Sequence, residues 1–284
     1  MTGRHPDPMI APAELHRRLS APDLRVLDAS WHLPASGRDA RGEFAAQRIP
    51  GASFFDIDDL SDTTNPAPHM LAPPEKFASR MRKLGVGDGA QIVVYDSLGV
   101  FSAARAWWMF RAMNCEDVFV LDGGLPAWIA AGYEVEDGPP MARGERHFSA
   151  RLRGDLVRSL SDMTRLIDKG GALILDARPP GRFAGRDPEP RPGLRGGHMP
   201  GALNVPYTAL LTGSGQLKSI ADLTAAFAGA GADAAKPAVA TCGSGVSAAV
   251  IALALARLGR WDTAIYDGSW AEWGARADTA VIAE

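Results

Sequence analysis

The chain has few cysteines. Only two, Cys115 and Cys242, occur among its 284 residues, which is too few for a disulfide framework. The opening stretch, MTGRHPDPMI, has no apolar core of the kind that a signal peptide needs. We therefore expect a reducing, cytoplasmic setting in which a free thiol persists.

Long hydrophobic runs, an excess of positive charge and clustered histidines are also absent from the sequence. The longest apolar run, around residues 248–256, is far shorter than the roughly 20 residues that a membrane span requires. The formal net charge of -3 gives no reason to expect a nucleic-acid partner. The six histidines form no spaced ligand cluster, so no metal site is expected.

What the sequence does contain is an internal repeat, and its length is sufficient for two domains. Four blocks recur in the same order, and their matching positions are Asp28 and Asp176, Pro50 and Pro200, Asp96 and Cys242, and Asp122 and Asp267. The separation stays between 145 and 150 residues in all four, which indicates a duplicated domain. Residues 136–155 are rich in proline, glycine and charge and are typical of a linker. We predict domains over residues 1–136 and 157–284, joined by a linker over 137–156.

Each copy alternates short apolar, β-branched runs with longer helix-like segments. Examples of the short runs are residues 91–95 and 172–175. This alternation predicts an α/β domain, in which parallel strands are joined by helices on both faces of the sheet. Ligands gather at the carboxyl ends of the strands in such sheets, and Cys242 follows a strand-like run directly.

The segment CGSGVSA places the Cys242 thiol between a strand and a helix. A helix N-terminus favours negative charge and therefore the reactive thiolate. Gly243 and Gly245 lack a Cβ, so the loop can curl tightly and direct backbone amides at the sulfur or at an anion beside it. The alternative is a buried structural cysteine. We assign that structural interpretation to Cys115 and the reactive one to Cys242.

The first copy has Asp96 where the second has Cys242. That domain therefore has the scaffold without the nucleophile, and we expect one copy to carry the chemistry while the other shapes the site. Other cysteine chemistries fit less well. A phosphatase needs an arginine six residues after the cysteine, where this chain has Ala248, and a Cys-x-x-Cys redox pair needs a cysteine where it has Gly245. No local signature of a papain-like protease surrounds Cys242.

Taken together, these motifs resemble two-domain rhodanese-type sulfurtransferases. The likeness to their catalytic half lies in CGSGVSA, DARPPGRFAGRDPEPR, GHMPGALNVP and YDGSWAEW. The likeness to their first half lies in VLDASWHLP, GRDARGEF, FFDIDDLSD, PHML and LDGG. The resemblance spans nearly the whole chain and implies tandem rhodanese-like domains. Thiosulfate enzymes of the family have basic side chains right after the cysteine, whereas Gly243 and Ser244 resemble the 3-mercaptopyruvate branch.

The resemblance implies that Arg182 and Arg191 hold the donor carboxylate. Mercaptopyruvate has one carboxylate, which suits an arginine fork, whereas dianionic thiosulfate favours cations beside the thiolate. The alternative is that both arginines are solvated surface charges. The donor-binding set is completed by loop residues, namely Gly243, Gly245, Val246 and Ser247.

A proton relay of Ser244, His69 and Asp58 is also implied by the resemblance. Histidine transfers protons near neutral pH, aspartate orients it, and a serine beside the sulfur passes a proton to the departing enolate. From the residues alone, His69 fits equally a turn histidine and Asp58 a helix cap. If the relay forms, the site lies in the cleft between the domains.

The implied reaction has two steps. Cys242 takes the sulfur of 3-mercaptopyruvate as a persulfide and releases pyruvate, and an acceptor thiol, a thioredoxin-like protein or cyanide then removes the outer sulfur. No metal or organic cofactor, nucleic acid or membrane is implied. Two alternatives remain open, namely thiosulfate:cyanide sulfur transfer and a non-catalytic module that captures an anion or a persulfidated partner.

The sequence departs from the family pattern at two positions. Arg48 stands where the family often has a histidine before IPGA, and Ser247 stands where threonine is usual. We expect Arg48 to be structural, because its counterpart His198 lies in the corresponding turn of the second copy. Ser247 keeps a hydroxyl at the start of the helix, so we expect a mild effect there.

Overall fold

Each half of the chain folds around a parallel five-stranded sheet in the computed structural model, which describes residues 7–284. Residues 1–6, which begin the stretch used above to argue against a signal peptide, lie outside the described residues. The strands of the first sheet are β1 (Met9–Ile10), β2 (Leu24–Asp28), β3 (Ser53–Phe54), β4 (Gln91–Tyr95) and β5 (Val118–Leu121). Those of the second are β6 (Val157–Arg158), β7 (Leu173–Asp176), β8 (Ala202–Asn204), β9 (Ala238–Thr241) and β10 (Ala264–Tyr266).

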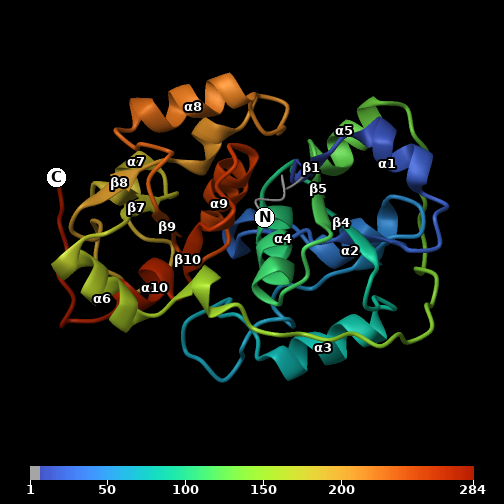
Figure 1. The fold of residues 1–284 in the computed structure, drawn as a ribbon, viewed down its shortest axis with the longest axis horizontal. Coiled ribbons are helices and arrows are strands. Elements are labelled where there is room, and N and C mark those ends of the chain that lie inside the picture. Colours follow the sequence, from blue (N-terminus) through green and yellow to red (C-terminus); the bar gives the residue numbers. More distant parts are fainter. Residues whose placement is uncertain (1–6) are drawn as a thin grey trace, which may run out of the picture.

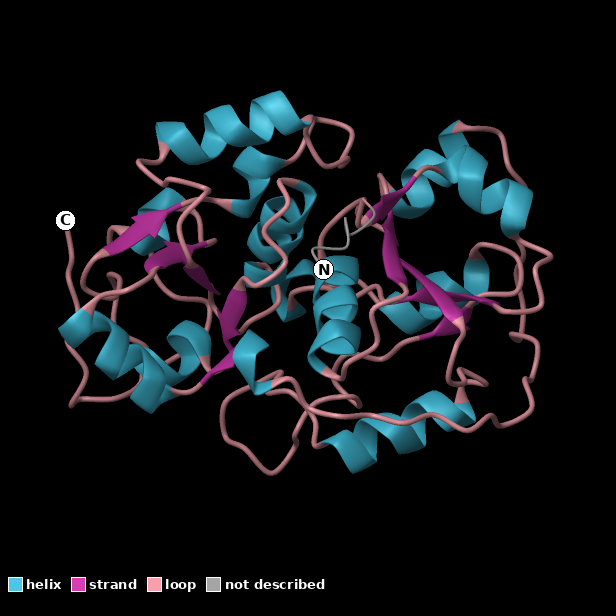
Figure 2. Ribbon diagram, in the orientation of Figure 1, coloured by secondary structure: helices cyan, strands magenta, loops and turns pink. Residues whose placement is uncertain are grey.

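The two sheets have the same topology. Their strand orders are β1-β5-β4-β2-β3 and β6-β10-β9-β7-β8, and Figure 2 shows them as two separate groups of strands. Helices of the first half are α1 (Pro12–Arg18), α2 (Ala40–Ala46), α3 (Pro74–Lys83), α4 (Ser102–Ala112) and α5 (Gly124–Ala130). Helices of the second half are α6 (Leu160–Lys169), α7 (Pro180–Phe183), α8 (Ile220–Gly229), α9 (Ala248–Arg257) and α10 (Ser269–Trp273). The predicted duplicated α/β fold is confirmed.

Helices α4 and α9 meet between the two halves (Figure 1). Every residue of α4 is buried, and so are residues 248–256 of α9. A helix that is apolar on all sides is stable only when it is covered on all sides. This explains the apolar run at 248–256: it is the centre of one hydrophobic cluster that includes residues of both halves.

The segment between the halves runs past α3 and crosses to the second half (Figure 1). No strand or helix lies between α5 and the short 3-10 helix η2 (Gly154–Leu156), apart from the bridge of Arg48 with Glu136. The Arg48 side chain is buried and donates from Nε to Glu136 Oε1 at 2.8 Å and from Nη1 to the Gly138 carbonyl at 2.7 Å. Arg48 therefore anchors the start of this segment, as its structural interpretation requires. The domain boundaries at 136 and 156 stay a prediction.

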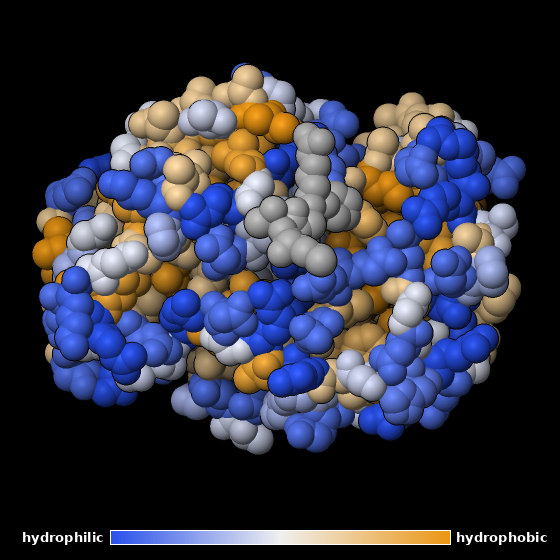
Figure 3. Space-filling model, in the orientation of Figure 1, coloured by the Kyte–Doolittle hydropathy of each residue, from blue (hydrophilic) through white to orange (hydrophobic). Residues whose placement is uncertain are grey.

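The surface is mainly polar on the face drawn in Figure 3, where apolar side chains form separate small patches. Leu33 and Leu98 are among the exposed large apolar residues, at 47% and 45% of full exposure. Within residues 7–284, no helix is both long enough and apolar enough to cross a membrane.

Candidate active site

Cys242 follows the carboxyl end of β9, at the edge of the sheet where ligands bind in such folds. Its side chain is buried, and the backbone N–H of Gly245 donates to its Sγ at 3.1 Å. Gly245 has φ +81°, a conformation that L-residues other than glycine rarely adopt. The predicted tight curl is therefore present, and one backbone amide is directed at the sulfur.

The counterpart loop of the first half shows what this loop geometry can hold. Asp96 is fully buried, and its carboxylate accepts N–H bonds from Leu98, Phe101 and Ala103 at 2.9, 2.8 and 2.8 Å. Burial raises the pKa of Asp96. The loop is a cradle of amides for a negative group. In the first half the chain's own carboxylate fills the cradle, and in the second half the thiol occupies that position.

A small pocket opens over Cys242 and has a volume of about 120 Å³. This is well below the roughly 300 Å³ at which pockets for drug-sized ligands begin. Its lining comes from both halves: Trp31, Leu33 and Phe101 from the first, and Arg178, Pro179, Arg182, Pro190, Arg191, Tyr207, Cys242, Gly243, Ser244, Val246 and Ser247 from the second. Of the predicted loop residues, Gly245 does not line the pocket but shapes the turn behind it. The Ser247 hydroxyl makes no capping bond to α9.

Arg182, at the end of α7, and Arg191, in the loop that follows, both line this pocket. A Cβ added to Gly243 would lie 3.1 Å from Arg182 Nη2 and 4.0 Å from Arg191 Nη1. The absence of a side chain at Gly243, the residue after the cysteine, therefore leaves room for both guanidinium groups. Burial lowers the pKa of Arg191, while Cys242 acts on it in the opposite direction.

Arg182 belongs to a chain of ion pairs with three further charged residues. The Glu189 side chain is buried and pairs with Arg182 at 2.5 Å and with Arg178 at 2.8 Å. Arg178 is itself buried and pairs with Asp176 at 2.7 Å. This chain of ion pairs fixes the wall of the pocket, because each buried charge has a partner.

The structure brings the three residues of the predicted relay together. His69 Nδ1 lies 2.9 Å from Ser244 Oγ, and His69 Nε2 lies 3.1 Å from Asp58 Oδ1. Trp31 Nε1 donates to the Asp58 carboxylate at 3.2 Å. The hydrogen bond from His69 lowers the pKa of Asp58. The His69 side chain is 5% exposed and that of Asp58 65%, so the chain of polar groups leads from the pocket to the surface.

Reasoning from the sequence missed several residues of this site. Trp31 and Arg178 line the pocket, and Glu189 orients Arg182. A usable signal existed for two of them, because Trp31 and Arg178 follow the carboxyl ends of strands β2 and β7. Nothing local distinguishes Glu189 from a surface carboxylate.

Cys115 has a different environment. It is half-buried beyond the end of α4, and burial raises the pKa of its thiol to about 12. A thiol that is so hard to ionise is a poor nucleophile at neutral pH. Both cysteines contact the same hydrophobic cluster, but only Cys242 also lines the pocket between the halves. The reactive role of Cys242 stays a prediction.

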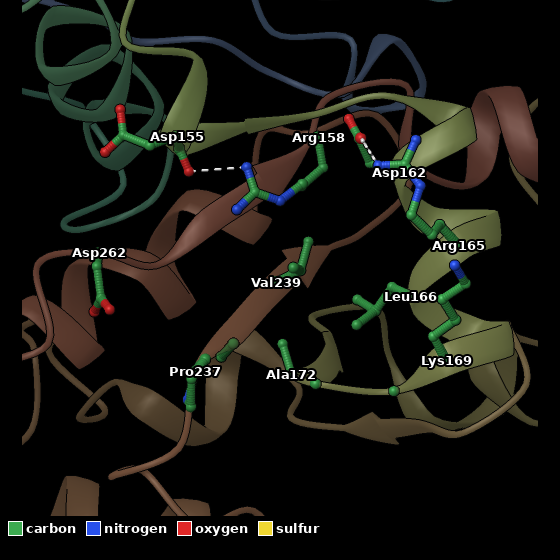
Figure 4. A pocket seen from close by; sticks show the side chains of 13 residues that line it. Asp155, Arg158, Asp162, Arg165, Leu166, Lys169, Ala172, Pro237, Val239 and Asp262 are labelled. Atoms are coloured by element: carbon green, nitrogen blue, oxygen red, sulfur yellow. Dashed lines mark hydrogen bonds and ion pairs between the residues drawn. The ribbon is translucent and has the colours of Figure 1, made fainter.

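A wider hollow of about 510 Å³ lies at the opposite edge of the second sheet (Figure 4). Its lining includes Ala172 and Pro237, which precede β7 and β9, and the charged residues Arg158, Asp162 and Lys169. It holds neither cysteine nor histidine. Among residues 7–284, no group of three or more His, Cys, Asp or Glu side chains is placed to hold a metal ion. The pocket at Cys242 is therefore the stronger candidate.

Comparison with known proteins agrees with this geometry. The 3-mercaptopyruvate sulfurtransferase of Escherichia coli (strain K12) is 45% identical over 268 residues, covering 94% of this chain and 95% of that protein. The thiosulfate sulfurtransferase of Gallus gallus is 43% identical over 256 residues, covering 89% and 87%. Relatives named for either sulfur donor are thus similarly close, so overall identity does not decide the donor.

Comparison with a solved structure and with a family model gives the same result. The crystal structure of SseA from Escherichia coli, described as a 3-mercaptopyruvate sulfotransferase, matches with a TM-score of 0.86 at 41% identity, covering 93% of this chain and 99% of that one. The family described as "Rhodanese-like domain" matches residues 11–131 and 159–276, once in each half. The chain therefore belongs to the rhodanese family and carries two rhodanese-like domains in tandem.

Proposed function

We propose that this protein is a 3-mercaptopyruvate sulfurtransferase that works through a persulfide on Cys242. The observation that carries the proposal is the contact between His69 Nδ1 and Ser244 Oγ at 2.9 Å, two residues from the cysteine and across the domain boundary. Transfer from mercaptopyruvate leaves a carbanion equivalent that must be protonated. Transfer from thiosulfate leaves sulfite, which needs no proton. A relay beside the thiol is useful for the first donor only.

In the first half-reaction, the Cys242 thiolate attacks the sulfur of the donor. A sulfur–sulfur bond forms, the carbon–sulfur bond breaks, and its electron pair passes to the carbon as the pyruvate enolate. Ser244 donates a proton to this carbon and regains one from His69, which Asp58 keeps oriented. The partial exposure of Asp58 gives the relay access to solvent protons.

Arg182 and Arg191 hold the carboxylate of the donor in this proposal. A guanidinium can donate two parallel hydrogen bonds to a carboxylate. Arg182 is fixed by Glu189, and both arginines face the space beside Gly243. The carboxylate would thus be held at one side of the pocket while the sulfur reaches Cys242.

In the second half-reaction, an acceptor thiol or cyanide attacks the outer sulfur, and Cys242 leaves as a thiolate. A thioredoxin-like protein is the proposed acceptor among thiols. We place the reaction in the cytoplasm, because Cys242 must stay a free thiol and reducing compartments maintain that state.

The donor preference can be measured directly. We expect kcat/KM for 3-mercaptopyruvate to exceed that for thiosulfate with the same thiol acceptor, and intact-mass analysis to detect one extra sulfur on Cys242. The Cys242→Ser variant should show neither turnover nor the adduct, whereas Cys115→Ser should behave like the wild type. A preference for thiosulfate would replace the proposed donor while leaving the nucleophile. Absence of turnover with both donors would favour a non-catalytic binding module.

A further inference from the structure

The two domains contact each other through equivalent loops, each of which donates a hydrogen bond to the facing domain. Residues 61–71 and 211–217 are each closed by an antiparallel bridge between their ends. The N–H of Leu71 donates to Asp267 Oδ2 at 2.6 Å, and the N–H of Leu217 donates to Asp122 Oδ1 at 2.9 Å. Asp122 and Asp267 are matching positions of the repeat. In each domain, the carboxylate at the matching position of the repeat thus accepts a hydrogen bond from the other domain's loop.

The two loops deliver different residues to the facing domain. Two positions before Leu71 lies His69, which contacts Ser244. Two positions before Leu217 lies Gly215, which packs so closely on Gly99 that a Cβ there would lie 3.2 Å from the Gly99 Cα. One half of this symmetric arrangement therefore places an imidazole against Ser244, two residues from Cys242, and in the other half two glycines pack against each other.

In the reactive half, the cation at the Asp267 carboxylate is Arg105 of α4. Its side chain is fully buried, although it belongs to the first domain. Nη2 donates to Asp267 Oδ1 at 2.8 Å and to the His69 carbonyl at 2.5 Å, and Nη1 donates to the Gly245 carbonyl at 3.4 Å. One guanidinium therefore contacts both the loop that carries His69 and the loop that carries Cys242.

His69 requires such support because of its backbone. It has φ +61°, a left-handed conformation that is unfavourable for a residue with a side chain. Arg105 donates to the carbonyl of this residue, while the imidazole itself contacts Ser244 and Asp58. In the other half, Arg257 lies 3.9 Å from Asp122 and donates to the Leu217 and Lys218 carbonyls at 3.3 and 3.4 Å.

We propose that Arg105 is a positioning residue for proton transfer. Through Asp267 and the carbonyls of His69 and Gly245, it keeps His69 in hydrogen-bonding distance of Ser244. This inference rests on the proposed function, because only a donor whose leaving group needs a proton makes the position of His69 important.

The test uses Arg105→Met and Arg105→Lys in the full-length protein, with Arg257→Met as the matched control. We expect Arg105→Met to slow pyruvate release in a single turnover with 3-mercaptopyruvate by on the order of 100-fold, the lower end of what a general acid contributes. Arg105→Lys keeps a charge near Asp267 but not the planar fork, so its loss should be smaller. Arg257→Met should keep the wild-type rate. Thermal unfolding will show whether Arg105→Met folds. If it does not, the single-turnover rate of Arg105→Lys is compared with that of the wild type instead.

Two further measurements separate positioning from general disruption. The rate at which iodoacetamide alkylates Cys242 should be unchanged in Arg105→Lys, because alkylation needs the thiol but no proton relay. In a His69→Ala background, Arg105→Lys should cause no further loss, because Arg105 acts through His69. A parallel fall in alkylation, or a full additional loss in the His69→Ala background, would overturn the assignment of Arg105 alone. A wild-type protein without turnover on mercaptopyruvate would overturn the proposed function and this inference together.

Discussion

At the scale of single residues, Glu189 determines how Arg182 can act. Its buried carboxylate accepts from Arg182 and Arg178, so Arg182 is held at the pocket wall by a partner that is itself anchored. An arginine on a solvated surface samples many rotamers, and fixing one costs entropy when a ligand binds. Glu189 therefore prepares Arg182 for a carboxylate before the donor arrives.

Removal of the Arg182 guanidinium tests this role. We expect Arg182→Ala to raise KM for 3-mercaptopyruvate roughly 10- to 100-fold, as the loss of a hydrogen bond between charged groups predicts, with a smaller change in kcat. The fold should persist because Glu189 keeps its bond to Arg178. Arg186→Ala, an exposed arginine of the same segment, is the control in steady-state assays. Equal increases of KM for the two variants, or for a donor without a carboxylate, would contradict the assignment.

At the scale of elements, the decisive feature is the loop between β9 and α9. It occupies the same place in the repeat as the loop between β4 and α4, where Asp96 receives three N–H bonds, while the N–H of Gly245 donates to Cys242 Sγ. In both, a parallel strand leads through a turn into a buried helix, and backbone N–H groups beyond the strand donate to the first residue after it. The two copies thus share the strand, turn and helix, and differ in the side chain after the strand, which is a carboxylate in Asp96 and a thiol in Cys242.

The turn itself depends on Gly245. A Cβ at this position would lie 3.0 Å from Arg105 Nη1 and 3.2 Å from the Asp267 carbonyl, in addition to the strain at φ +81°. We expect Gly245→Ala to lower the free energy of unfolding by on the order of 1–3 kcal/mol and to reduce turnover, measured by urea unfolding and by sulfur transfer.

Gly259 supplies the control for that substitution. It follows α9 with φ +90°, and a Cβ there would meet nothing within 4 Å. Gly259→Ala should therefore cost only the backbone strain of about 1–2 kcal/mol and leave turnover intact. If Gly259→Ala lowered turnover as much as Gly245→Ala, the close packing of the cysteine loop would not be the cause.

At the scale of the whole molecule, the two domains share one core. Helices α4 and α9 belong to a single hydrophobic cluster, and Arg111 of the first domain lies over both Trp107 and Trp261, with its guanidinium carbon 5.5 and 4.6 Å from the ring centroids. Separation of the domains would expose this surface, which is costly in water. The first domain therefore contributes to the common core, and its Trp31, Leu33 and Phe101 line the pocket at Cys242.

A shared core predicts cooperative unfolding. We expect urea unfolding followed by far-UV circular dichroism and by tryptophan fluorescence to give coincident single transitions, although the chain has two domains. Each domain contains tryptophans, among them Trp108 and Trp270, so fluorescence reports on both. Two resolved transitions would show that the domains unfold independently.

Much of the fold was accessible from the sequence because its signals are local or repeated. The β-branched run of β4 and the apolar helix at 248–256 are short-range patterns, and the matching positions Asp96 and Cys242 follow from the repeat. The two-residue strands β1 and β6 gave no such signal, because two residues are too few for a periodicity. The family resemblance suggested His69 and Asp58, but the residues alone left both roles open.

The sequence by itself determined the duplicated α/β scaffold, the thiol between a strand and a helix, and the replacement of that thiol by Asp96 in the other copy. Only the tertiary structure decided that His69 meets Ser244, 175 positions away, and that Arg105 meets Asp267, 162 positions away. The physical reason is that such contacts depend on how α4 packs against α9 and on which residues of the facing domain each loop contacts. No pattern within a single segment encodes that placement, because it is the sum of many packing contacts across the domain boundary.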